Sequence, residues 1–347
     1  MRLGTTILAL ASTASAMATN NCRRTSPAYT FENLVSFGDS YTDDGRLAYY
    51  VAHKANGPPA GVLPPQSSVT SSGGLTWAQL VQRSVPGLGL YDYASSGAVC
   101  SNAIVSRYLS SINNSYPSVI DNEVPWFKAD LAAGNLTLYK NRTAENTVYS
   151  LWIGTNDLGS GGFLTEKQAA GANLTTYVEC IWSVFDAIYA TGGRRFVLLN
   201  VAPLHLAPLY RPSSQGGEKK SVTNETEYAS KMMEYSTSVN TMFDYGVPFH
   251  TIVKKRWSGS TVTIFNTHQL LTDIYNNPSA YLTAPANSTG WYHHCAGSVC
   301  TNVANTTINS FMFYDDLHPS NKTDSIIAEN FIKVVNGTSK YGTTYKS

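Results

Sequence analysis

Short β-rich runs alternate with helical patterns along most of this chain, and this alternation restricts the folds that it can adopt. Apolar and β-branched runs predict strands at 34–37, 91–94, 148–153, 195–201 and 262–265. Apolar residues at helical spacing predict helices over 75–85, 177–188, 225–245 and 323–335. Strands that alternate with helices predict an α/β fold, in which helices cover both faces of a central parallel sheet.

Polar motifs stand at or just beyond the ends of three predicted strands. Gly38-Asp39-Ser40 follows the first strand, Gly97 lies beyond the second, and Gly154-Thr155-Asn156-Asp157 follows the third. In parallel sheets of this kind, sites form outside the carboxyl ends of the strands. We therefore expect the functional residues of this chain at that edge of the sheet.

These motifs contain the groups that an acyl-transfer reaction needs. A serine hydroxyl needs an adjacent base, and a histidine can act as that base when a carboxylate fixes its tautomer. Ser40 follows a strand and a glycine, and Asp315 stands three residues before His318, a spacing that allows both side chains to share one face of a turn. Asn156 offers an amide donor for an oxyanion, and Gly97 lacks a Cβ, so its N–H can approach a ligand closely.

Each of these motifs taken alone has a plainer interpretation. Gly-Asp-Ser is usually a turn, Asn-Asp after a strand is usually a turn or a helix cap, and Asp-x-x-His is usually a capped helix entry. Their occurrence together, in order, at strand ends and in loops favours a serine esterase site.

The segments FGDSYTD, YASSGA, GTND and DDLHP resemble blocks I, II, III and V of the GDSL, or SGNH, hydrolase family. The resemblance spans residues 37–319 and implies a flavodoxin-like, three-layer α/β/α fold. It also implies that Ser40 is the nucleophile, His318 the base and Asp315 the carboxylate that orients the base. The implied oxyanion hole consists of the backbone N–H groups of Ser40 and Gly97 and the side-chain amide of Asn156.

Three further segments, FENLVSFGDSYTDDGRL, VPWFKADL and VAPLHLAPLY, resemble fungal secreted acetylesterases of carbohydrate esterase family 16. This resemblance implies hydrolysis of acetyl esters of sugars, notably acetylated xylo-oligosaccharides, through an acyl-serine intermediate. One position departs from the family pattern, because Ser96 stands where relatives often have a glycine before the equivalent of Gly97. The oxyanion donor is kept, and the loop is expected to be stiffer.

Other polar and aromatic residues near these motifs have structural interpretations. Asp316 competes with Asp315 for the role of orienting carboxylate, and the family spacing favours Asp315. His205 is expected to bind a loop carbonyl rather than to line the pocket. The remaining expectations are that Asp39 and Asp43 brace the turn, Asp157 fixes local backbone, and Trp126 and Phe127 lie in the core rather than forming a sugar platform.

The N-terminal residues have the pattern of a secretory signal peptide. Arg2 precedes a largely apolar run at 3–11, and small residues that suit cleavage follow at 14–18. Residues 1–18 are therefore expected to be a signal peptide, and 19–347 a single esterase domain. Nine Asn-x-Ser/Thr sequons favour eukaryotic secretion; they begin at Asn113, Asn135, Asn141, Asn173, Asn224, Asn287, Asn305, Asn321 and Asn336.

Five cysteines follow the expected cleavage site, and disulfides are expected because the compartment is oxidising. Cys295 and Cys300 are close enough to join one loop. His293 and His294 beside them raise the possibility of zinc, but the four-ligand spacing of a structural zinc site is missing. We expect no metal, and we expect Cys180, in a strongly apolar helical pattern, to be a buried free thiol.

Composition narrows the possible partners. The net charge is +1 and only 14% of residues are charged, which argues against nucleic acid or an anionic membrane as the main partner. No run approaches the length of a membrane span. We expect a soluble monomer that needs no cofactor and binds a small-molecule or oligosaccharide ester.

Two other functions deserve comparison with the acetylesterase. A GDSL lipase or acylhydrolase for longer chains would share the catalytic residues, but no amphipathic lid segment is evident. A non-catalytic carbohydrate-binding glycoprotein is disfavoured because none of the catalytic positions is substituted. The chain also lacks the Gly-x-Ser-x-Gly elbow of the α/β-hydrolases.

Overall fold

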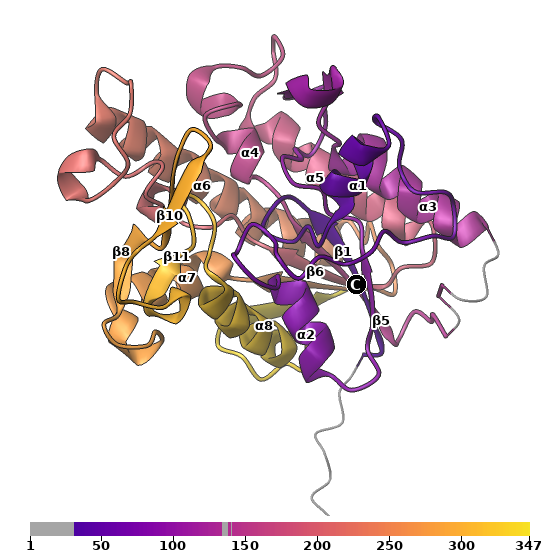
Figure 1. The fold of residues 1–347 in the computed structure, drawn as a ribbon. Coiled ribbons are helices and arrows are strands. Elements are labelled where there is room, and N and C mark those ends of the chain that lie inside the picture. The colour runs from indigo at the N-terminus through magenta and orange to yellow at the C-terminus, as the bar shows by residue number, and fades with distance from the viewer. Residues whose placement is uncertain (1–30, 134–137, 140) are drawn as a thin grey trace, which may run out of the picture.

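A six-stranded sheet forms the centre of the computed structural model, which describes residues 31–133, 138–139 and 141–347 (Figure 1). In spatial order its strands are β2 (Gly89–Asp92), β1 (Asn33–Gly38), β5 (Thr147–Trp152), β6 (Arg195–Leu199), β7 (Thr261–Phe265) and β12 (Gly342–Lys346). The first five are parallel, and β12 pairs antiparallel to β7. The five parallel strands have the flavodoxin-like order 2-1-3-4-5. The predicted α/β fold with a central parallel sheet is confirmed.

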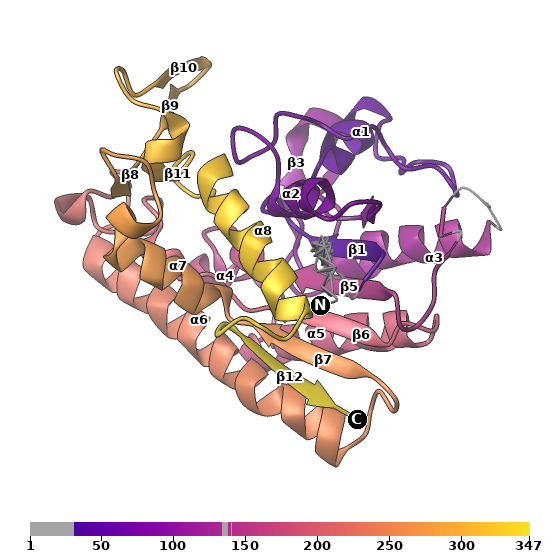
Figure 2. The ribbon, with the colours of Figure 1, turned by 90° about the horizontal axis from the view of Figure 1, so that it is seen from below.

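Helices cover both faces of this sheet (Figures 1 and 2). α2 (Trp77–Ser84) and α8 (Asn321–Val335) pack together on one face. On the other face lie α3 (Val124–Ala132), α5 (Leu174–Tyr189) and α6 (Glu225–Pro248). The remaining elements lie outside these layers or are short: α1 (Arg46–Ala52), α4 (Thr155–Leu158), α7 (Thr267–Asn276), and the strand pairs β3 (Tyr108–Leu109) with β4 (Asn114–Ser115), β8 (Asn287–Trp291) with β11 (Phe311–Phe313), and β9 (His293–Ala296) with β10 (Val299–Asn302).

The central strands are buried on both faces, as expected for a parallel sheet between two helical layers. All six residues of β1 and all six of β5 are buried. Phe37 of β1 packs edge-to-face on Phe127 of α3, with ring centroids 5.6 Å apart. On the opposite face, Trp77 of α2 packs against Trp152 of β5, at 6.5 Å, and Phe331 of α8 packs against Phe265 of β7, at 6.4 Å. These contacts hold the two helical layers against the sheet and so fix the strand ends from which the polar loops emerge.

Some elements differ from the sequence prediction for local reasons. α2 begins at Trp77 because Thr76 caps it: the Thr76 side chain accepts a hydrogen bond from the Gln79 N–H, and Gln79 Oε1 accepts one from the Thr76 N–H. α6 continues to Pro248, beyond the expected end at 245. The edge strand β12 was not predicted. The expected signal peptide at 1–18 lies outside the described residues.

The prediction of a free thiol at Cys180 is wrong. Cys180 of α5 forms a disulfide with Cys100, 80 residues earlier in the chain. The apolar surroundings were predicted correctly, since the two cysteines are 7% and 0% exposed. Their pairing joins α5 to the loop that follows β2. Cys22, the remaining cysteine, lies outside the described residues.

Candidate active site

Ser40, His318 and Asp315 lie together although 278 residues separate the first two. Ser40 stands in the turn after β1, and the other two lie in the loop between β11 and α8. Ser40 Oγ lies 2.7 Å from His318 Nε2, and His318 Nδ1 lies 2.8 Å from Asp315 Oδ2. A carboxylate only accepts hydrogen bonds, so Nδ1 donates to Asp315 and Nε2 is left to accept the Ser40 proton. This is the arrangement that acyl transfer requires.

A tight turn holds the Asp315 carboxylate in place. Its Oδ1 accepts the backbone N–H groups of Leu317, at 2.9 Å, and His318, at 2.7 Å. Ser320 then caps α8 by accepting from the N–H of Thr323. The carboxylate and the imidazole are therefore oriented by the same short segment.

Electrostatics favours an ionised Asp315 and a basic His318. Burial raises the pKa of Asp315, but the neighbouring His318 and two backbone N–H groups outweigh it and hold that pKa below the usual value. Burial lowers the pKa of His318, but Asp315 outweighs it and raises that pKa above the ordinary 6.5. Asp316 differs, because burial and Glu218 raise its pKa to about 7. Its carboxylate has no hydrogen bond to His318 among the described residues.

The turn that carries Ser40 is braced by two carboxylates, as the sequence suggested. Asp39 accepts the N–H of Tyr41 at 3.0 Å. Asp43 accepts backbone N–H groups at the start of α1, including Arg46 at 2.6 Å, and also that of Ser96 at 2.7 Å. The Ser96 contact joins the Ser40 turn to the loop that contains Gly97. The positive φ of Gly38 and the close approach of the Trp152 carbonyl leave no room for a side chain where this turn leaves the strand.

The three expected oxyanion donors emerge at the same edge of the sheet. Among the described residues, neither the Ser40 nor the Gly97 backbone N–H has a hydrogen-bond partner. Asn156 Nδ2 donates one hydrogen bond, to the Ala98 carbonyl at 2.8 Å, which leaves its second N–H free. Gly97 has a φ of 82°, and a Cβ there would overlap the ring of Tyr116. This loop therefore requires glycine.

Three residues that sequence reasoning did not assign to the site support these groups. Tyr41 donates its hydroxyl to the Leu317 carbonyl at 2.8 Å, and its ring packs against His318 with centroids 5.6 Å apart. Arg107 contacts Asn156 and the Gly97 carbonyl. Cys100 continues the Gly97 loop, and its N–H donates to Asp157 at 2.8 Å, which matches the expected backbone role of Asp157. Tyr41 stands within the FGDSYTD segment, although nothing in that segment indicates its contact with His318. Arg107 and Cys100 stand outside the motifs, so only the fold reveals their roles.

Two further expectations concern His205 and the aromatic pair at 126–127. Within the described residues, His205 Nδ1 has no hydrogen-bond partner, so the expected bond to a loop carbonyl is not formed by that nitrogen. His205 instead lines a separate cavity of about 180 Å³ with Arg211 and Tyr275. Phe127 is fully buried, as expected, whereas Trp126 is half-buried and packs beside Tyr50.

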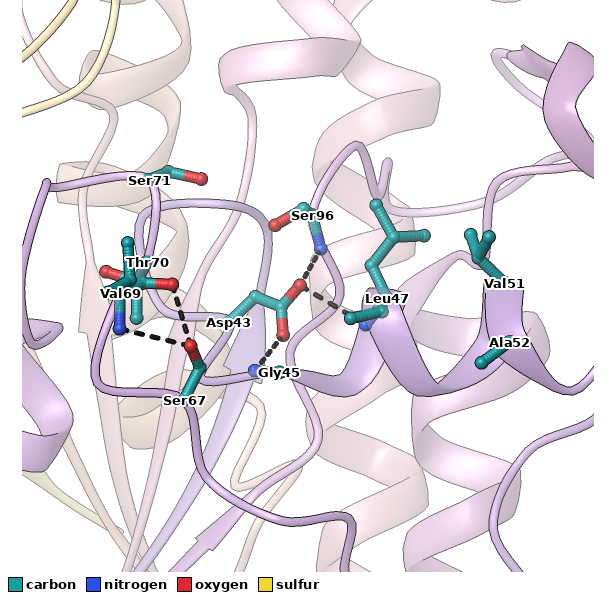
Figure 3. A pocket seen from close by; sticks show the side chains of 11 residues that line it. Asp43, Gly45, Leu47, Val51, Ala52, Ser67, Val69, Thr70, Ser71 and Ser96 are labelled. Atoms are coloured by element: carbon teal, nitrogen blue, oxygen red, sulfur yellow. Dashed lines mark hydrogen bonds between the residues drawn. The ribbon is translucent and has the colours of Figure 1, made fainter.

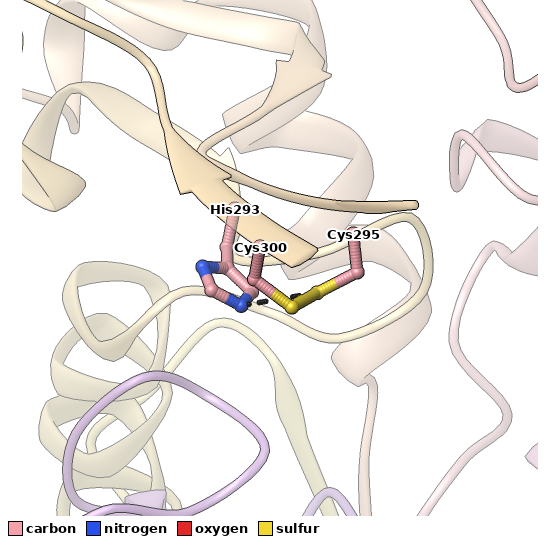
Figure 4. Close-up of side chains that lie close together, drawn as sticks. All are labelled: His293, Cys295 and Cys300. Atoms are coloured by element: carbon pink, nitrogen blue, oxygen red, sulfur yellow. Dashed lines mark hydrogen bonds between the residues drawn. A yellow bond between two sulfur atoms is a disulfide. The ribbon is translucent and has the colours of Figure 1, made fainter. Parts of the chain in front are cut away.

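The β9–β10 hairpin contains the histidines and cysteines that raised the question of zinc (Figure 4). Cys295 and Cys300 form the predicted disulfide, and His293 Nε2 lies 3.3 Å from Cys295 Sγ. A disulfide leaves no thiolate to bind a metal ion. These residues therefore form a disulfide-bonded hairpin at the surface.

The sequons differ in how open their asparagines are. Among those that the structure describes, five are exposed: Asn113, Asn141, Asn173, Asn224 and Asn305. Asn287, Asn321 and Asn336 are half-buried. Asn321 also donates its side-chain amide to the Leu75 carbonyl at 2.9 Å, so a glycan there would leave a single N–H on that nitrogen for this contact beside α2. Asn135 lies outside the described residues.

A groove of about 610 Å³ begins at Ser96, next to Gly97 (Figure 3). One wall is the face of α1 that carries Leu47 and Val51, and the other is the segment 67–71. Its surface is mixed, with apolar side chains beside serine and threonine hydroxyls. Asp43 is the charged residue among those that line it, and its carboxylate is already occupied by backbone N–H groups.

A doubly wound sheet with a Ser–His–Asp cluster at its carboxyl edge is typical of hydrolases that use a serine nucleophile, and comparison with known proteins specifies the kind. The model for GDSL-like lipase/acylhydrolase matches residues 34–331, so the chain belongs to this family and is a carboxylic ester hydrolase. In addition, no helix among the described residues is both long and apolar enough to span a membrane.

Two fungal proteins named acetylesterase are similar to this chain. One, from Hypocrea jecorina, is 52% identical over 329 residues, which cover 92% of this chain and 93% of the relative. The other, from Thermothelomyces thermophilus, is 30% identical over 260 residues, which cover 72% and 82%. Among solved structures, an acetylxylan esterase from Geobacillus stearothermophilus aligns over 88% of this chain and 96% of its own, with a TM-score of 0.35 and 15% identity.

Proposed function

We propose that this chain is a secreted acetylesterase that hydrolyses acetyl esters of carbohydrates, such as acetylated xylo-oligosaccharides, and that Ser40 is its nucleophile. One observation carries the proposal: the chain of hydrogen bonds from Ser40 Oγ through His318 to Asp315, at 2.7 and 2.8 Å. Each of the two contacts falls within the distance that general-base catalysis needs.

The first half of the reaction transfers the acetyl group to Ser40. His318 Nε2 takes the proton from Ser40 Oγ as that oxygen attacks the ester carbonyl carbon. The C–O bond to the sugar then breaks, and His318 returns the proton to the departing sugar oxygen. Asp315 keeps its negative charge throughout and stabilises the imidazolium. The products of this half are the free sugar hydroxyl and acetyl-Ser40.

The second half repeats the same chemistry with water. His318 takes a proton from a water molecule, whose oxygen attacks the acetyl carbonyl of acetyl-Ser40. The bond to Ser40 Oγ breaks, and the proton passes from His318 to that oxygen. Acetate leaves and the enzyme is restored, so this mechanism requires neither a metal ion nor an organic cofactor.

Both halves pass through a tetrahedral intermediate that carries a negative oxygen. The backbone N–H groups of Ser40 and Gly97 and the free amide N–H of Asn156 are the proposed donors to it. Donors fixed before the reaction cost no reorganisation as the charge develops. Removing one such donor lowers turnover by about 10²-fold to 10³-fold in comparable sites.

A short acyl group is supported by the relatives. The two fungal proteins that are similar to this chain carry the name acetylesterase. We therefore propose acetyl, rather than a long acyl chain, as the group that is transferred to Ser40.

The groove in Figure 3 supports a sugar as the alcohol part of the ester. Its apolar residues, such as Leu47 and Val51, suit the C–H faces of a sugar ring, and the hydroxyls of Ser71 and Ser96 suit its hydroxyl groups. No lysine or arginine is among the residues that line it. A neutral, hydroxyl-rich leaving group therefore fits this groove better than an anionic one.

Secretion is supported by three features of the chain. The N-terminal residues have the pattern of a signal peptide, five sequon asparagines are exposed, and two disulfides are formed. Disulfides of this kind persist in oxidising compartments. The proposed enzyme acts as a monomer outside the cell.

Acetate release from acetylated xylo-oligosaccharides, with mapping of the products, tests this function. In parallel, rates on p-nitrophenyl acetate and p-nitrophenyl octanoate should show a clear preference for acetate. Val51→Trp, which fills the groove, should slow the oligosaccharide reaction and leave p-nitrophenyl acetate unaffected, whereas Val62→Trp, an exposed position outside the groove, should change neither. A faster octanoyl reaction would refute the acetylesterase and favour a GDSL lipase.

A further inference from the structure

Arg107 lies outside every motif of the sequence, yet it contacts two residues of the proposed oxyanion hole. It is half-buried and stands just before β3. Its Nη1 donates to Asn156 Oδ1 at 2.6 Å and to the Gly97 carbonyl at 2.7 Å. One guanidinium nitrogen therefore joins two loops that follow different strands, β2 and β5.

The contact with Asn156 determines which end of the side-chain amide faces the proposed oxyanion hole. An amide has one accepting and one donating end of nearly equal size, whereas a guanidinium can only donate. Arg107 therefore stabilises the orientation in which Oδ1 points toward it. Nδ2 then points the other way, where one N–H binds the Ala98 carbonyl and the second is free for the oxyanion.

The contact with Gly97 fixes the second donor. The guanidinium lies over the ring of Tyr116, 4.9 Å from its centroid, and the same ring packs against the Gly97 backbone. The Arg107 carbonyl also accepts the Tyr116 N–H at 2.9 Å. Arg107, Tyr116 and Gly97 therefore form one packed unit, which holds the peptide of the Gly97 loop in place.

The direct contacts of Arg107 are with residues of the proposed oxyanion hole. Within the described part of the chain, no carboxylate lies within ion-pair distance of it, and its hydrogen-bond partners Asn156 and Gly97 are neutral acceptors. At longer range, burial raises the pKa of Asp39 and Asp157, and the charge of Arg107 opposes that rise. Arg107 is therefore held by the two oxyanion-hole loops rather than by an ion pair.

We propose that Arg107 is a positioning residue, which orients the Asn156 amide and the Gly97 loop so that both donors face the oxyanion. Among the described residues, it has no hydrogen bond to Ser40, His318 or Asp315. This role depends on the function proposed above and deepens it, because it names the residue that presets the site for the tetrahedral intermediate. A positioning role of this kind affects turnover more than substrate binding.

A double-mutant cycle between Arg107 and Asn156 tests this role on p-nitrophenyl acetate. Arg107→Met keeps a long stem over Tyr116 and removes the donors, so kcat should fall by about 10-fold to 100-fold, the range found when a residue that orients a metal ligand is removed. KM should change by less than about threefold. In an Asn156→Ala background, Arg107→Met should cost less than about threefold more, since its main target is gone. Arg107→Lys should recover part of the loss.

The matched control is Arg142→Met. Arg142 is also half-buried, lies over a tyrosine ring at 5.7 Å and donates to a backbone carbonyl, that of Thr191, but it contacts no site residue. Its substitution should leave kcat unchanged, even if the melting temperature falls as much as in Arg107→Met.

Two outcomes would overturn the role of Arg107. If the losses of Arg107→Met and Asn156→Ala multiply in the double variant, Arg107 acts independently of the amide. If Arg107→Met raises KM and leaves kcat unchanged, the residue binds substrate instead. Ser40→Ala distinguishes these failures from a failure of the proposed function: an active Ser40→Ala refutes both, whereas an inactive one leaves only the Arg107 role in question.

Discussion

The two disulfides should contribute very differently to stability, because they close loops of very different length. The Cys100–Cys180 bond spans 80 residues, whereas the Cys295–Cys300 bond spans 5. A cross-link stabilises the fold mainly by restricting the unfolded chain, and the restriction grows with the logarithm of loop length. The chain-entropy relation gives about 4.5 kcal/mol for the long loop and about 2 kcal/mol for the short one.

We therefore expect Cys100→Ala/Cys180→Ala to lose about twice as much unfolding free energy as Cys295→Ala/Cys300→Ala. Both variants lose the same atoms, but Cys100 and Cys180 are buried whereas Cys295 and Cys300 are exposed. Cys100→Ala/Cys180→Ala therefore also loses packing, and reduction of the parent separates the effect of the bond from that loss. Equilibrium unfolding in urea without reductant measures the difference. The m-value should also rise more in Cys100→Ala/Cys180→Ala, because the unfolded chain expands further when the disulfide that closes the longer loop is absent.

The reasoning fails if the hairpin variant proves as destabilised as the long-loop variant, or more so. It also fails if Cys100→Ala/Cys180→Ala unfolds at the urea concentration of the parent. Reducing the parent under native conditions gives a check that needs no substitution. The reduced parent should approach the stability of a chain that lacks both bonds.

Three further predictions concern the site and its surroundings. Asp315→Asn should lower kcat by about 10⁴-fold. Because Asp315 raises the pKa of His318, this variant should also move the acidic limb of the pH–rate profile for p-nitrophenyl acetate to lower pH. An acidic limb at the same pH as in the parent would contradict the pairing of Asp315 with His318. Gly97→Ala should lower kcat/KM by roughly 10²-fold, because its Cβ overlaps Tyr116 at a φ of 82°; full activity would show that the loop tolerates a side chain. Burial, with Asp43 nearby, raises the pKa of Asp44 from 3.8 to about 7. The folded state therefore binds the proton of the Asp44 carboxyl more tightly than the unfolded state does. The free energy of unfolding should fall as the pH rises from 3.8 to about 7. Urea unfolding at several pH values should show that the free energy of unfolding depends less on pH in Asp44→Asn than in the parent. The same pH dependence in both proteins would refute the raised pKa of Asp44.

The sheet and the catalytic cluster could be predicted from sequence because their signals are local. The central strands are short apolar runs, which predict a parallel sheet, whereas the order of the strands was implied only by the resemblance to the GDSL family. Ser40, Gly97, Asn156 and His318 stand in short motifs at strand ends or loops. The edge strand β12 gave no such signal, because its residues are half-buried or exposed and it pairs along one side only.

The pairing of Cys180 and the role of Arg107 depended on tertiary structure. The apolar pattern of α5 correctly predicted a buried cysteine, but only the path of the loop after β2 brings Cys100 against it. Arg107 and Asn156 are 49 residues apart, and neither spacing nor composition links them. Contacts between loops of this kind arise from the assembled sheet rather than from any local pattern.

The most direct measurement of the central claim is the rate of p-nitrophenyl acetate hydrolysis by Ser40→Ala. Loss of the nucleophile in a triad of this kind costs about 10⁶-fold in turnover, so the variant should be indistinguishable from background while it keeps the melting temperature of the parent. Ser214→Ala, at an exposed serine outside the groove, is the control and should remain active. Hydrolysis by Ser40→Ala within tenfold of the parent rate would contradict a mechanism through acetyl-Ser40.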